Sequence, residues 1–168
     1  MRDFSDIELK ELLENDSPET ASDLAAEADA IRRQYYSDEV YIRGLIEFSN
    51  YCKNNCYYCG IRGGNTGAVR YRLTKEEILS CCQEGYDLGF RTFVLQSGED
   101  PYFSDEKICG IVAAIRHEHP DCAITLSIGE KPRESYQAYY DAGANRYLLR
   151  HETASEEHYQ KLHPKEMS

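Results

Sequence analysis

Long hydrophobic runs are missing from this sequence of 168 residues. No stretch approaches the roughly 18 consecutive apolar residues that indicate a transmembrane helix. The first residues, Met1 to Ser5, contain no apolar core typical of a secretory signal. Basic residues are also scarce, because 19 Lys and Arg stand against 30 Asp and Glu, a formal net charge of −11. A nucleic-acid binder needs a basic surface to neutralise phosphates, so we expect a soluble, cytoplasmic protein with no nucleic-acid or membrane partner.

Two common catalytic motifs are absent as well. No Gly-x-Ser-x-Gly sequence occurs, which removes the usual signature of a hydrolase nucleophile. The glycine-rich run from Arg62 to Gly67 (RGGNTG) lacks the Gly-Lys-Ser/Thr ending of a phosphate-binding loop and opens no predicted helix. We interpret this run as a flexible loop or lid.

Cysteine, by contrast, is abundant, since the chain has seven. An odd number cannot all be paired, and disulfides are rare in the cytosol, so metal binding or redox chemistry is favoured over a disulfide framework. Hydrophobic residues make up 41% of the chain, which is enough for one core of ordinary size. The composition therefore predicts a folded protein that uses some of its cysteines for chemistry.

The apolar pattern predicts helices and strands in alternation. Ser5 to Glu8 is a capping box that opens a first helix, and Ser17-Pro18 opens a second that runs to about Tyr35. A β-branched stretch from Val40 to Phe48 predicts the first strand. Beyond it the sequence predicts helices that begin near Thr74, Ile108 and Tyr136, strands at 93–95, 123–128 and 147–149, and a final helix over 155–163.

Strands that alternate with helices pair in parallel and give an α/β fold. Right-handed crossovers place the four strands side by side in chain order, as about four βα units of a (β/α) barrel of the TIM type. We expect residues 1–36 to form an amino-terminal helical extension and residues 37–168 to form a partial barrel. Four strands are half of the eight that close such a barrel, and half a barrel exposes its strand edges and apolar interior. The chain is therefore predicted to be an amino-terminal fragment, or to receive the other half from another chain.

Three cysteines follow the first predicted strand at close spacing. Cys52, Cys56 and Cys59 form a Cys-x3-Cys-x2-Cys motif. Three thiolates can bind three corners of a cubane iron–sulfur cluster and leave the fourth iron open, as a catalytic metal centre does. An electron-transfer ferredoxin would need a fourth cysteine, and a structural zinc site usually takes four ligands in Cys-x2-Cys pairs. The spacing thus favours a [4Fe-4S] cluster with an open site, and a zinc-binding module is the alternative.

This motif, with an aromatic residue before its last cysteine, resembles the signature of the radical S-adenosylmethionine (radical SAM) superfamily. Further stretches resemble one branch of it, the [FeFe]-hydrogenase maturases called HydE, which are relatives of biotin synthase and methylornithine synthase. These stretches are RGLIEFSN (43–50), LQSGED (95–100), LSIGE (126–130) and LRHET (149–153). The resemblance extends from about Tyr35 to the end of the chain and implies a radical SAM barrel.

The resemblance implies roles for the residues of the motif. Cys52, Cys56 and Cys59 would bind the [4Fe-4S] cluster, whose free iron chelates the amino and carboxylate groups of S-adenosylmethionine (SAM). Electron transfer into the sulfonium would release methionine and a 5′-deoxyadenosyl radical. Tyr58 would lie beside the adenine of SAM. The cofactor supplies the difficult chemistry, and the protein orients it and excludes water.

The same resemblance implies cofactor-binding residues at the strand ends. Ser97, Gly98 and Glu99 stand where the superfamily has a glycine-rich motif that binds the methionine ammonium. Gly98 allows a close backbone approach, and a carboxylate is the natural partner of an ammonium. Glu152 would be a second cofactor-binding carboxylate, and Arg150 would bind a carboxylate. The alternative is that Arg150 and Glu152 merely pair with each other.

Other cysteines and histidines have simpler interpretations. Cys81, Cys82, Cys109 and Cys122 are interpreted as small buried hydrophobic side chains. His119 is expected to be a solvated charge at a helix end. His151 is expected to be a packing residue, because strand alternation would turn it away from its neighbours Arg150 and Glu152.

The cysteine motif and the resemblance together imply a radical SAM enzyme that cleaves SAM reductively and acts in assembly of the [FeFe]-hydrogenase metal centre. The predicted partners are a small-molecule or iron-complex substrate, contacted by Ser127 at the end of the third strand, and an electron donor such as flavodoxin or ferredoxin. An enzyme of the biotin synthase or methylornithine synthase type would share the cofactor chemistry. A non-enzymatic iron–sulfur or zinc-binding module is the alternative from another class.

Overall fold

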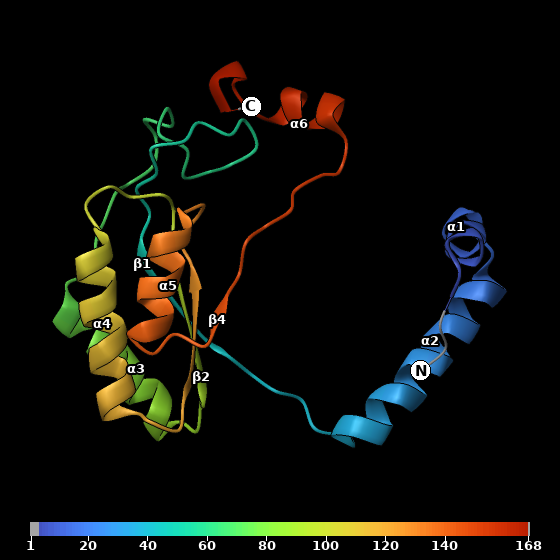
Figure 1. Cartoon of the computed structure of the whole chain (residues 1–168), viewed down its shortest axis with the longest axis horizontal. Helices are drawn as coiled ribbons and strands as arrows, with labels where there is room; N and C mark the ends of the chain where they lie inside the picture. The colour runs from blue at the N-terminus through green and yellow to red at the C-terminus, as the bar shows by residue number, and fades with distance from the viewer. Residues whose placement is uncertain (1–3, 168) are drawn as a thin grey trace. The chain divides into compact units, whose positions relative to one another are not determined.

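The computed structural model describes residues 4–167 (Figure 1). The chain forms two compact units, one up to Tyr41 and the other from Ile42 onward. The predicted boundary between residues 36 and 37 falls at the end of the second helix, Tyr36. The assignment of these units as separate domains stays a prediction.

The first unit contains two helices. In α1 (Asp6–Glu14) the Ser5 hydroxyl accepts a hydrogen bond from the Glu8 amide at 3.3 Å, and the Glu8 carboxylate accepts one from the Ser5 amide at 2.8 Å. The capping box therefore forms as predicted. α2 (Pro18–Tyr36) begins after Ser17, with proline in its first turn. Neither helix contains a buried residue, so apolar side chains such as Leu13 remain exposed.

The second unit is built on a parallel sheet of four strands that lie in chain order, which confirms the predicted α/β fold. The strands are β1 (Gly44–Ser49), β2 (Thr92–Ser97), β3 (Ala123–Ser127) and β4 (Arg146–Tyr147). The helices between them are α3 (Lys75–Asp87), α4 (Asp105–Glu118) and α5 (Arg133–Asp141). After β4 come α6 (Glu156–Leu162) and a short 3-10 helix (Lys165–Met167). Each crossover helix starts near the carboxyl end of the preceding strand, which is the end where barrel enzymes place their functional loops.

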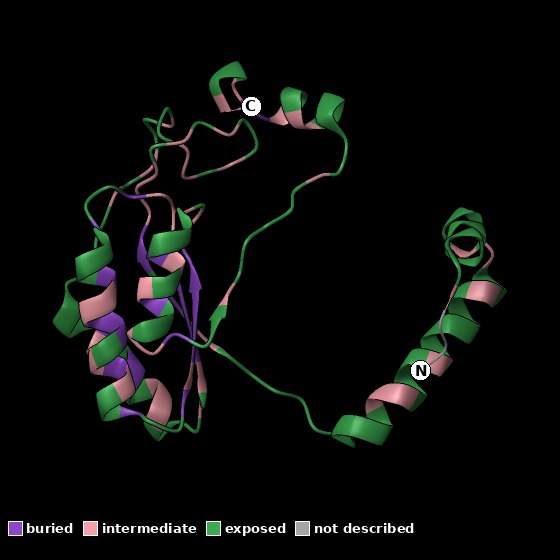
Figure 2. Ribbon diagram, viewed as in Figure 1, coloured by how far each residue is buried: buried purple, intermediate pink, exposed green. Residues whose placement is uncertain are grey.

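The core lies between the sheet and the helices that cover one of its faces (Figure 2). Ile46, Leu95, Leu126 and Tyr147 are paired in register across the four strands, and the first three are at most 7% exposed. On the other face of the sheet Leu45 is 56% exposed. The helices contribute to the core Ile78 and Cys82 of α3, Ile108, Ile111, Val112 and Ile115 of α4, and Tyr139 of α5. The uncovered face is the one that would line the interior of a closed barrel.

Three strands are shorter than the sequence predicts, β3 only by Ile128. β1 begins at Gly44 rather than at Val40, whose residue surface is 82% exposed. Val40 and Ile42 have the β-branched side chains that are typical of strands, but pairing with β2 starts only at Gly44. β4 covers two residues instead of 147–149, although the Leu148 amide still donates to the Leu126 carbonyl at 2.8 Å. An edge strand with one partner needs few ladder bonds, and the chain leaves the sheet after this contact.

His119 and Cys81 differ from the sequence interpretation, and Cys109 is only partly buried. His119, the residue that follows α4, is 2% exposed rather than solvated. It is buried because its ring stacks on the Tyr86 ring, with 4.6 Å between the ring centroids. Cys81 is exposed on α3, whereas Cys82 and Cys122 are buried as expected. Adjacent positions on a helix face different directions, so only one of the two neighbouring cysteines reaches the core.

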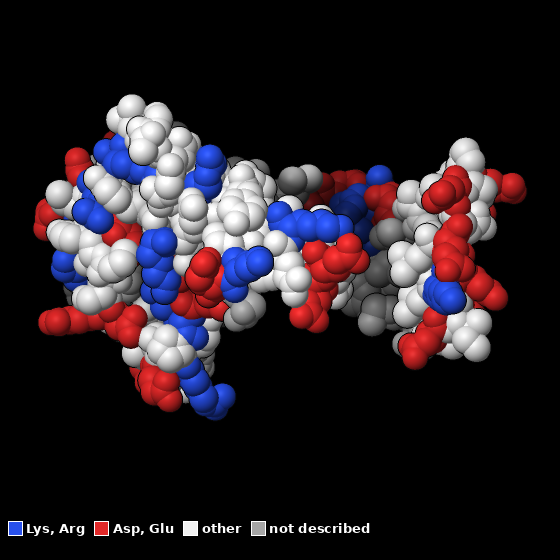
Figure 3. Space-filling model, turned by 90° about the horizontal axis from the view of Figure 1, so that it is seen from above, with Lys and Arg blue, Asp and Glu red and all other residues white. Residues whose placement is uncertain are grey.

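Within residues 4–167 no helix is long and apolar enough to cross a membrane. Acidic side chains predominate on α1 and α2 (Figure 3), in keeping with the net charge of the chain.

Candidate cofactor-binding site

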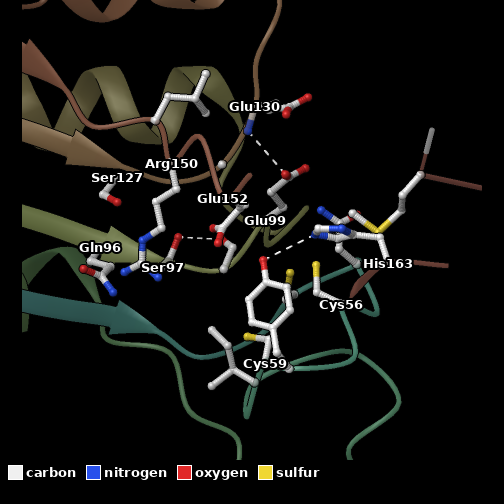
Figure 4. A pocket seen from close by; sticks show the side chains of 18 of the residues that line it. Cys56, Cys59, Gln96, Ser97, Glu99, Ser127, Glu130, Arg150, Glu152 and His163 are labelled. Carbon is white, nitrogen blue, oxygen red and sulfur yellow. Dashed lines mark hydrogen bonds between the residues drawn. The ribbon is translucent and has the colours of Figure 1, made fainter. Parts of the chain in front are cut away.

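All ten residues predicted for the site line one pocket of about 250 Å³. They are Cys52, Cys56, Tyr58, Cys59, Ser97, Gly98, Glu99, Ser127, Arg150 and Glu152. The pocket lies where β1, β2, β3 and β4 end. In Figure 4, Arg150, Glu152 and Glu99 reach into it from the strand ends, while Cys56, Cys59 and His163 face them from the other side. Residues that lie far apart in the sequence thus line one pocket.

The three cysteines lie on a loop of residues 50–72, called here the cysteine loop, which starts where β1 ends. Its two ends are tied together: Ser49 and Arg72 form an antiparallel bridge. The Asn50 carboxamide donates to the Val69 carbonyl at 2.7 Å and accepts from the Tyr71 amide at 2.8 Å. The loop therefore leaves and re-enters the fold at one place, and this gives a long loop a fixed base.

Arg70 holds the interior of the cysteine loop. Its guanidinium donates to the carbonyls of Ile61 at 2.9 Å, Arg62 at 2.7 Å and Asn65 at 3.2 Å, and also to that of Asn50. These carbonyls come from the start and the middle of the loop, so Arg70 ties both to the end of the loop. The five donors of a guanidinium suit this task, because one lysine ammonium cannot span four acceptors in a plane. The sequence interpretation did not identify Arg70.

The donor set fits an iron–sulfur cluster. Cys52, Cys56 and Cys59 are free thiols, partly exposed into the pocket. Burial, and then the neighbouring Cys52, raises the pKa of the Cys56 thiol. Among residues 4–167 no three His, Cys, Asp or Glu side chains converge where a single ion could sit. A cubane has a different requirement, since each cysteine binds its own iron.

Gly98 explains how the cysteine loop comes so close to β2. A Cβ atom added at Gly98 would lie 2.4 Å from the Tyr51 carbonyl oxygen and 2.6 Å from the Cys52 Cβ. The sequence predicted a close backbone approach at Gly98, toward the methionine ammonium. The structure shows a close approach of the first cysteine itself, and this sets Cys52 against the strand end.

Asp100 fastens the cysteine loop to the end of β2. Its fully buried carboxylate accepts two hydrogen bonds from Arg72, at 2.7 and 2.8 Å, and one from the Ser49 hydroxyl at 2.6 Å. The Tyr102 amide donates a fourth at 3.0 Å. Burial acts to raise the pKa of the Asp100 carboxyl, but the bonds from Arg72 and Ser49 outweigh it and hold the pKa below its usual range. A bidentate pair of this kind also fixes the orientation of the two side chains relative to each other.

Replacement of Asp100 by alanine is expected to lower the free energy of unfolding by about 2–3 kcal/mol. The loss is smaller than the 3–5 kcal/mol typical when a fully buried pair is broken, because the Arg72 side chain is 34% exposed. Asp121→Ala is the matched control, since its pair with Arg91 at 3.0 Å is about half exposed on both sides and should contribute less than about 1 kcal/mol. Urea denaturation measures both variants, and equal losses would contradict the prediction.

The contribution of Asp100 should also depend on pH. A carboxyl whose folded pKa is depressed stabilises the fold above its unfolded pKa, about 3.9, and this stabilisation is lost as the pH falls through the folded pKa. The difference between the wild type and Asp100→Ala should therefore be constant from about pH 5 to 7 and shrink in more acidic solution. A difference that grew on acidification would have the wrong sign.

Glu99 is held in place from both sides of the pocket. Its carboxylate contacts the Lys53 ammonium at 3.0 Å and accepts a hydrogen bond from the Glu130 amide at 3.2 Å. Gly129, with φ of +80°, leaves the space that Glu99 occupies, because a Cβ there would lie 2.1 Å from the Glu99 Cγ. Only glycine combines this left-handed backbone with an empty side-chain position. The carboxylate is thus directed into the pocket, where it lies 14% exposed.

His163 is a pocket residue that the sequence interpretation missed. It is 3% exposed, stacks on the Tyr159 ring at 3.9 Å, and its Nε2 lies 3.3 Å from the Tyr58 hydroxyl. The Tyr57 amide donates to the Leu162 carbonyl at 2.9 Å. The end of α6 therefore packs on the cysteine loop beside Cys56 and Cys59. Only a weak signal existed in the sequence, namely a histidine at the end of a helix that follows the last strand.

The remaining predicted residues lie beyond or at strand ends. Ser127 ends β3 and is 8% exposed, whereas Arg150 and Glu152 lie in the segment after the shortened β4. Burial, and then the Glu152 carboxylate, raises the pKa of Tyr58, so Glu152 faces that ring. Within residues 4–167 no ion pair joins Arg150 to Glu152. His151 lines the pocket rather than packing in the core, because strand alternation does not reach this far.

Comparisons with known proteins bear on this site. The family model of the radical SAM superfamily matches residues 46–167. The chain is 48% identical over 97% of its length to the [FeFe] hydrogenase maturase subunit HydE of Thermotoga maritima. It is 34% identical over 95% of its length to a 3-methylornithine synthase of Methanosarcina acetivorans. A crystal structure of methylornithine synthase matches 98% of the chain with a TM-score of 0.85 and 31% identity.

The match covers only part of each relative. The chain spans 46% of the HydE sequence, 45% of the 3-methylornithine synthase sequence and 49% of the crystallised chain, so it has about half the length of the relatives it matches. The relatives are enzymes, and members of the superfamily use a [4Fe-4S] cluster and SAM. The family match extends over more than half of the chain and includes all the strand ends that form the pocket. On this evidence the chain belongs to the radical SAM superfamily.

Proposed function

We propose that the protein containing this chain cleaves SAM reductively and acts in assembly of the [FeFe]-hydrogenase metal centre. The observation that carries the proposal is the joining of three free thiols and two carboxylates, Glu99 and Glu152, in one pocket at the carboxyl end of the sheet. The 48% identity to a HydE maturase supports the choice of pathway. When bound, a [4Fe-4S] cluster supplies the electron that splits SAM into methionine and a 5′-deoxyadenosyl radical.

The cysteine loop provides the cluster ligands in this proposal. Cys52, Cys56 and Cys59 bind three irons, and the fourth position stays free for SAM. Arg70 and Asp100 keep the loop in place through the contacts described above. This preorganisation matters because a binding site works only when its ligands are held by a rigid surrounding shell.

The strand ends orient SAM. Glu99 accepts the methionine ammonium in a charge-assisted hydrogen bond, and Lys53 and the Glu130 amide hold it in position. Tyr58 covers the adenine. Its hydroxyl lies beside His163, which fixes the ring at the mouth of the pocket. Burial and Glu152 raise the Tyr58 pKa, so the hydroxyl stays protonated at neutral pH.

The uncovered face of the sheet supplies the substrate surface. Ser127 lies at the pocket end of β3, and Arg150 projects toward Gln96 and Ser97 in Figure 4. A guanidinium and a hydroxyl suit a small substrate that carries a carboxylate or other anionic group. Glu152 contributes a second carboxylate to the cofactor site. These assignments follow the placement of functional groups at strand ends in barrel enzymes.

Formation of 5′-deoxyadenosine from SAM tests the proposal. Full-length protein carrying these residues is reconstituted with iron and sulfide without oxygen, reduced with dithionite and incubated with SAM. The expected result is a broad iron–sulfur absorbance, a spectrum that changes when SAM is added, and release of 5′-deoxyadenosine. One zinc and no iron per chain, or iron without SAM cleavage, would remove the enzyme proposal.

Substrate choice is tested separately. A biotin synthase or methylornithine synthase type would share the SAM chemistry, and 34% identity keeps the second type open. If the protein matures a hydrogenase, the full-length protein should activate an apo-hydrogenase when it is added with the other maturation proteins. Formation of 3-methylornithine, without any effect on hydrogenase, would favour the alternative.

A further inference from the structure

The peptide group between Gly129 and Glu130, in the loop after β3, is hydrogen-bonded on both sides. Its N–H donates to the Glu99 carboxylate at 3.2 Å, a bond drawn in Figure 4. Its carbonyl accepts a hydrogen bond from the Tyr147 hydroxyl at 2.6 Å. The group is trans and planar, so its N–H and its C=O point in opposite directions. Glu99 and Tyr147 therefore hold one rigid plane from opposite sides.

Tyr147 is itself fixed by its place in the short strand β4. The amides of Asn145 and Leu148, on either side of it, donate to two carbonyls of β3 at 2.9 and 2.8 Å. The Tyr147 ring lies edge-on to Tyr136, with 4.7 Å between the ring centroids, and parallel to Tyr139 at 6.5 Å. Both rings belong to α5. The hydroxyl of Tyr147 is thus held against the loop after β3 by backbone and ring contacts together.

The bond from Tyr147 acts on the strength of the bond to Glu99 as well as on its direction. Burial, and then the neighbouring Tyr136, raises the pKa of Tyr147, so its hydroxyl keeps the proton that it donates to the Gly129 carbonyl. A donor at the carbonyl polarises the peptide group and makes its N–H a better donor, because linked hydrogen bonds strengthen one another. The contact that reaches Glu99 therefore begins at Tyr147.

Tyr139 has a hydroxyl in the same group of rings but a different partner. It is 1% exposed, and its hydroxyl donates to the Asp105 carboxylate, which also accepts a hydrogen bond from Ser135 at 2.5 Å. This bond joins α5 to the first residue of α4 and does not involve the loop after β3. Of these two neighbouring tyrosines, Tyr139 joins two helices, whereas Tyr147 reaches the loop that contacts Glu99.

We propose that Tyr147 is a positioning residue for SAM, which orients the Glu99 carboxylate toward the methionine ammonium through the peptide group 129–130. The inference rests on the proposed function, in which Glu99 binds that ammonium. Tyr147 acts through the peptide, because its own side chain does not line the pocket. Without the hydroxyl the peptide group is free to turn. The Glu99 carboxylate is then directed by Lys53, whose side chain is 60% exposed and holds it less firmly.

Tyr147→Phe tests the inference, because it removes the hydroxyl and keeps the ring. The variant is made in the full-length protein, reconstituted with iron and sulfide without oxygen, and titrated with SAM in a calorimeter. The dissociation constant for SAM is expected to rise about fivefold, the usual effect of one lost hydrogen bond. The KM for SAM should rise by the same factor while kcat changes less than about twofold, since the lost contact acts on binding.

Tyr139→Phe is the matched control. It also removes one buried tyrosine hydroxyl, so it should lower the urea midpoint, but it should leave the dissociation constant for SAM within about twofold of the wild type. A second ligand, 5′-methylthioadenosine, lacks the amino-acid group of SAM and therefore offers no ammonium to Glu99. Its dissociation constant should be the same for the wild type and Tyr147→Phe.

The outcomes separate this role of Tyr147 from the proposed function. An unchanged dissociation constant for SAM in Tyr147→Phe, or an equal rise in Tyr139→Phe, would overturn the role while the wild type still cleaved SAM. An equal rise for 5′-methylthioadenosine would also overturn it, because the hydroxyl would then support the pocket as a whole. A wild-type protein that neither bound nor cleaved SAM would overturn the proposed function, and the role of Tyr147 with it.

Discussion

Cys56→Ser is expected to abolish iron–sulfur assembly and SAM cleavage together. Soft thiolates are the ligands that iron–sulfur clusters take, and a serine hydroxyl stays protonated and hard at neutral pH. The Cys56 backbone carbonyl accepts from the Cys59 amide at 3.1 Å, and serine retains this bond. The loop conformation should therefore persist while one iron loses its ligand. Iron and sulfide content, visible absorbance and 5′-deoxyadenosine formation measure the effect.

Cys81→Ser is the matched control for this change. Cys81 is an exposed free thiol on α3 and does not line the pocket. Its replacement should leave iron content and activity at wild-type levels. A Cys56→Ser protein with full iron content, or equal losses in the two variants, would show that the cysteine loop does not hold the cluster.

Gly98→Ala is expected to reduce cluster loading nearly as strongly, although it removes no ligand. The added methyl group would lie 2.4 Å from the Tyr51 carbonyl oxygen and 2.6 Å from the Cys52 Cβ. Neither contact can be relieved by rotating a side chain, so the loop must move away from β2. Overpacking of this kind costs about 1–3 kcal/mol in the free energy of unfolding, and it displaces the first cysteine from its position. Iron content and urea denaturation give the two readouts.

Gly110→Ala separates this steric effect from a general cost of alanine. Gly110 lies inside α4, and a Cβ there has no neighbour within 4 Å. Alanine should raise stability at this position by about 0.5–1 kcal/mol, because glycine is unfavourable within a helix. Normal iron content in Gly98→Ala would contradict the interpretation, since the displaced loop is its central consequence.

Local features of the fold could be predicted from the sequence. The capping box at Ser5 and the helix start at Thr74 depend on side chains that bond to amides three residues away, and both form as expected. The order of the four strands also follows from a local rule, because right-handed crossovers leave few alternatives. Strand lengths could not be predicted, since Val40 and Leu148 carry strand-like side chains but lack sustained partners.

The contacts that hold the site could not be predicted in the same way. Nothing in the local sequence distinguishes Arg70 or Asp100 from ordinary loop residues. Their roles depend on carbonyls and hydroxyls of distant segments, such as Ser49, which lies 51 residues from Asp100. His163 reaches Tyr58 across 105 residues. No spacing rule connects positions so far apart.

The sequence by itself determined the chemistry offered by this protein: three thiols within eight residues, carboxylates after strands, and helices that alternate with strands. These are local properties, because spacing and periodicity act over a few residues. Only the tertiary structure decided that the strand ends meet in one pocket, that Gly98 and Gly129 leave room for Cys52 and Glu99, and that α6 packs on the cysteine loop. Such contacts arise from packing and charge pairing between segments whose separation along the chain carries no information about their distance in space.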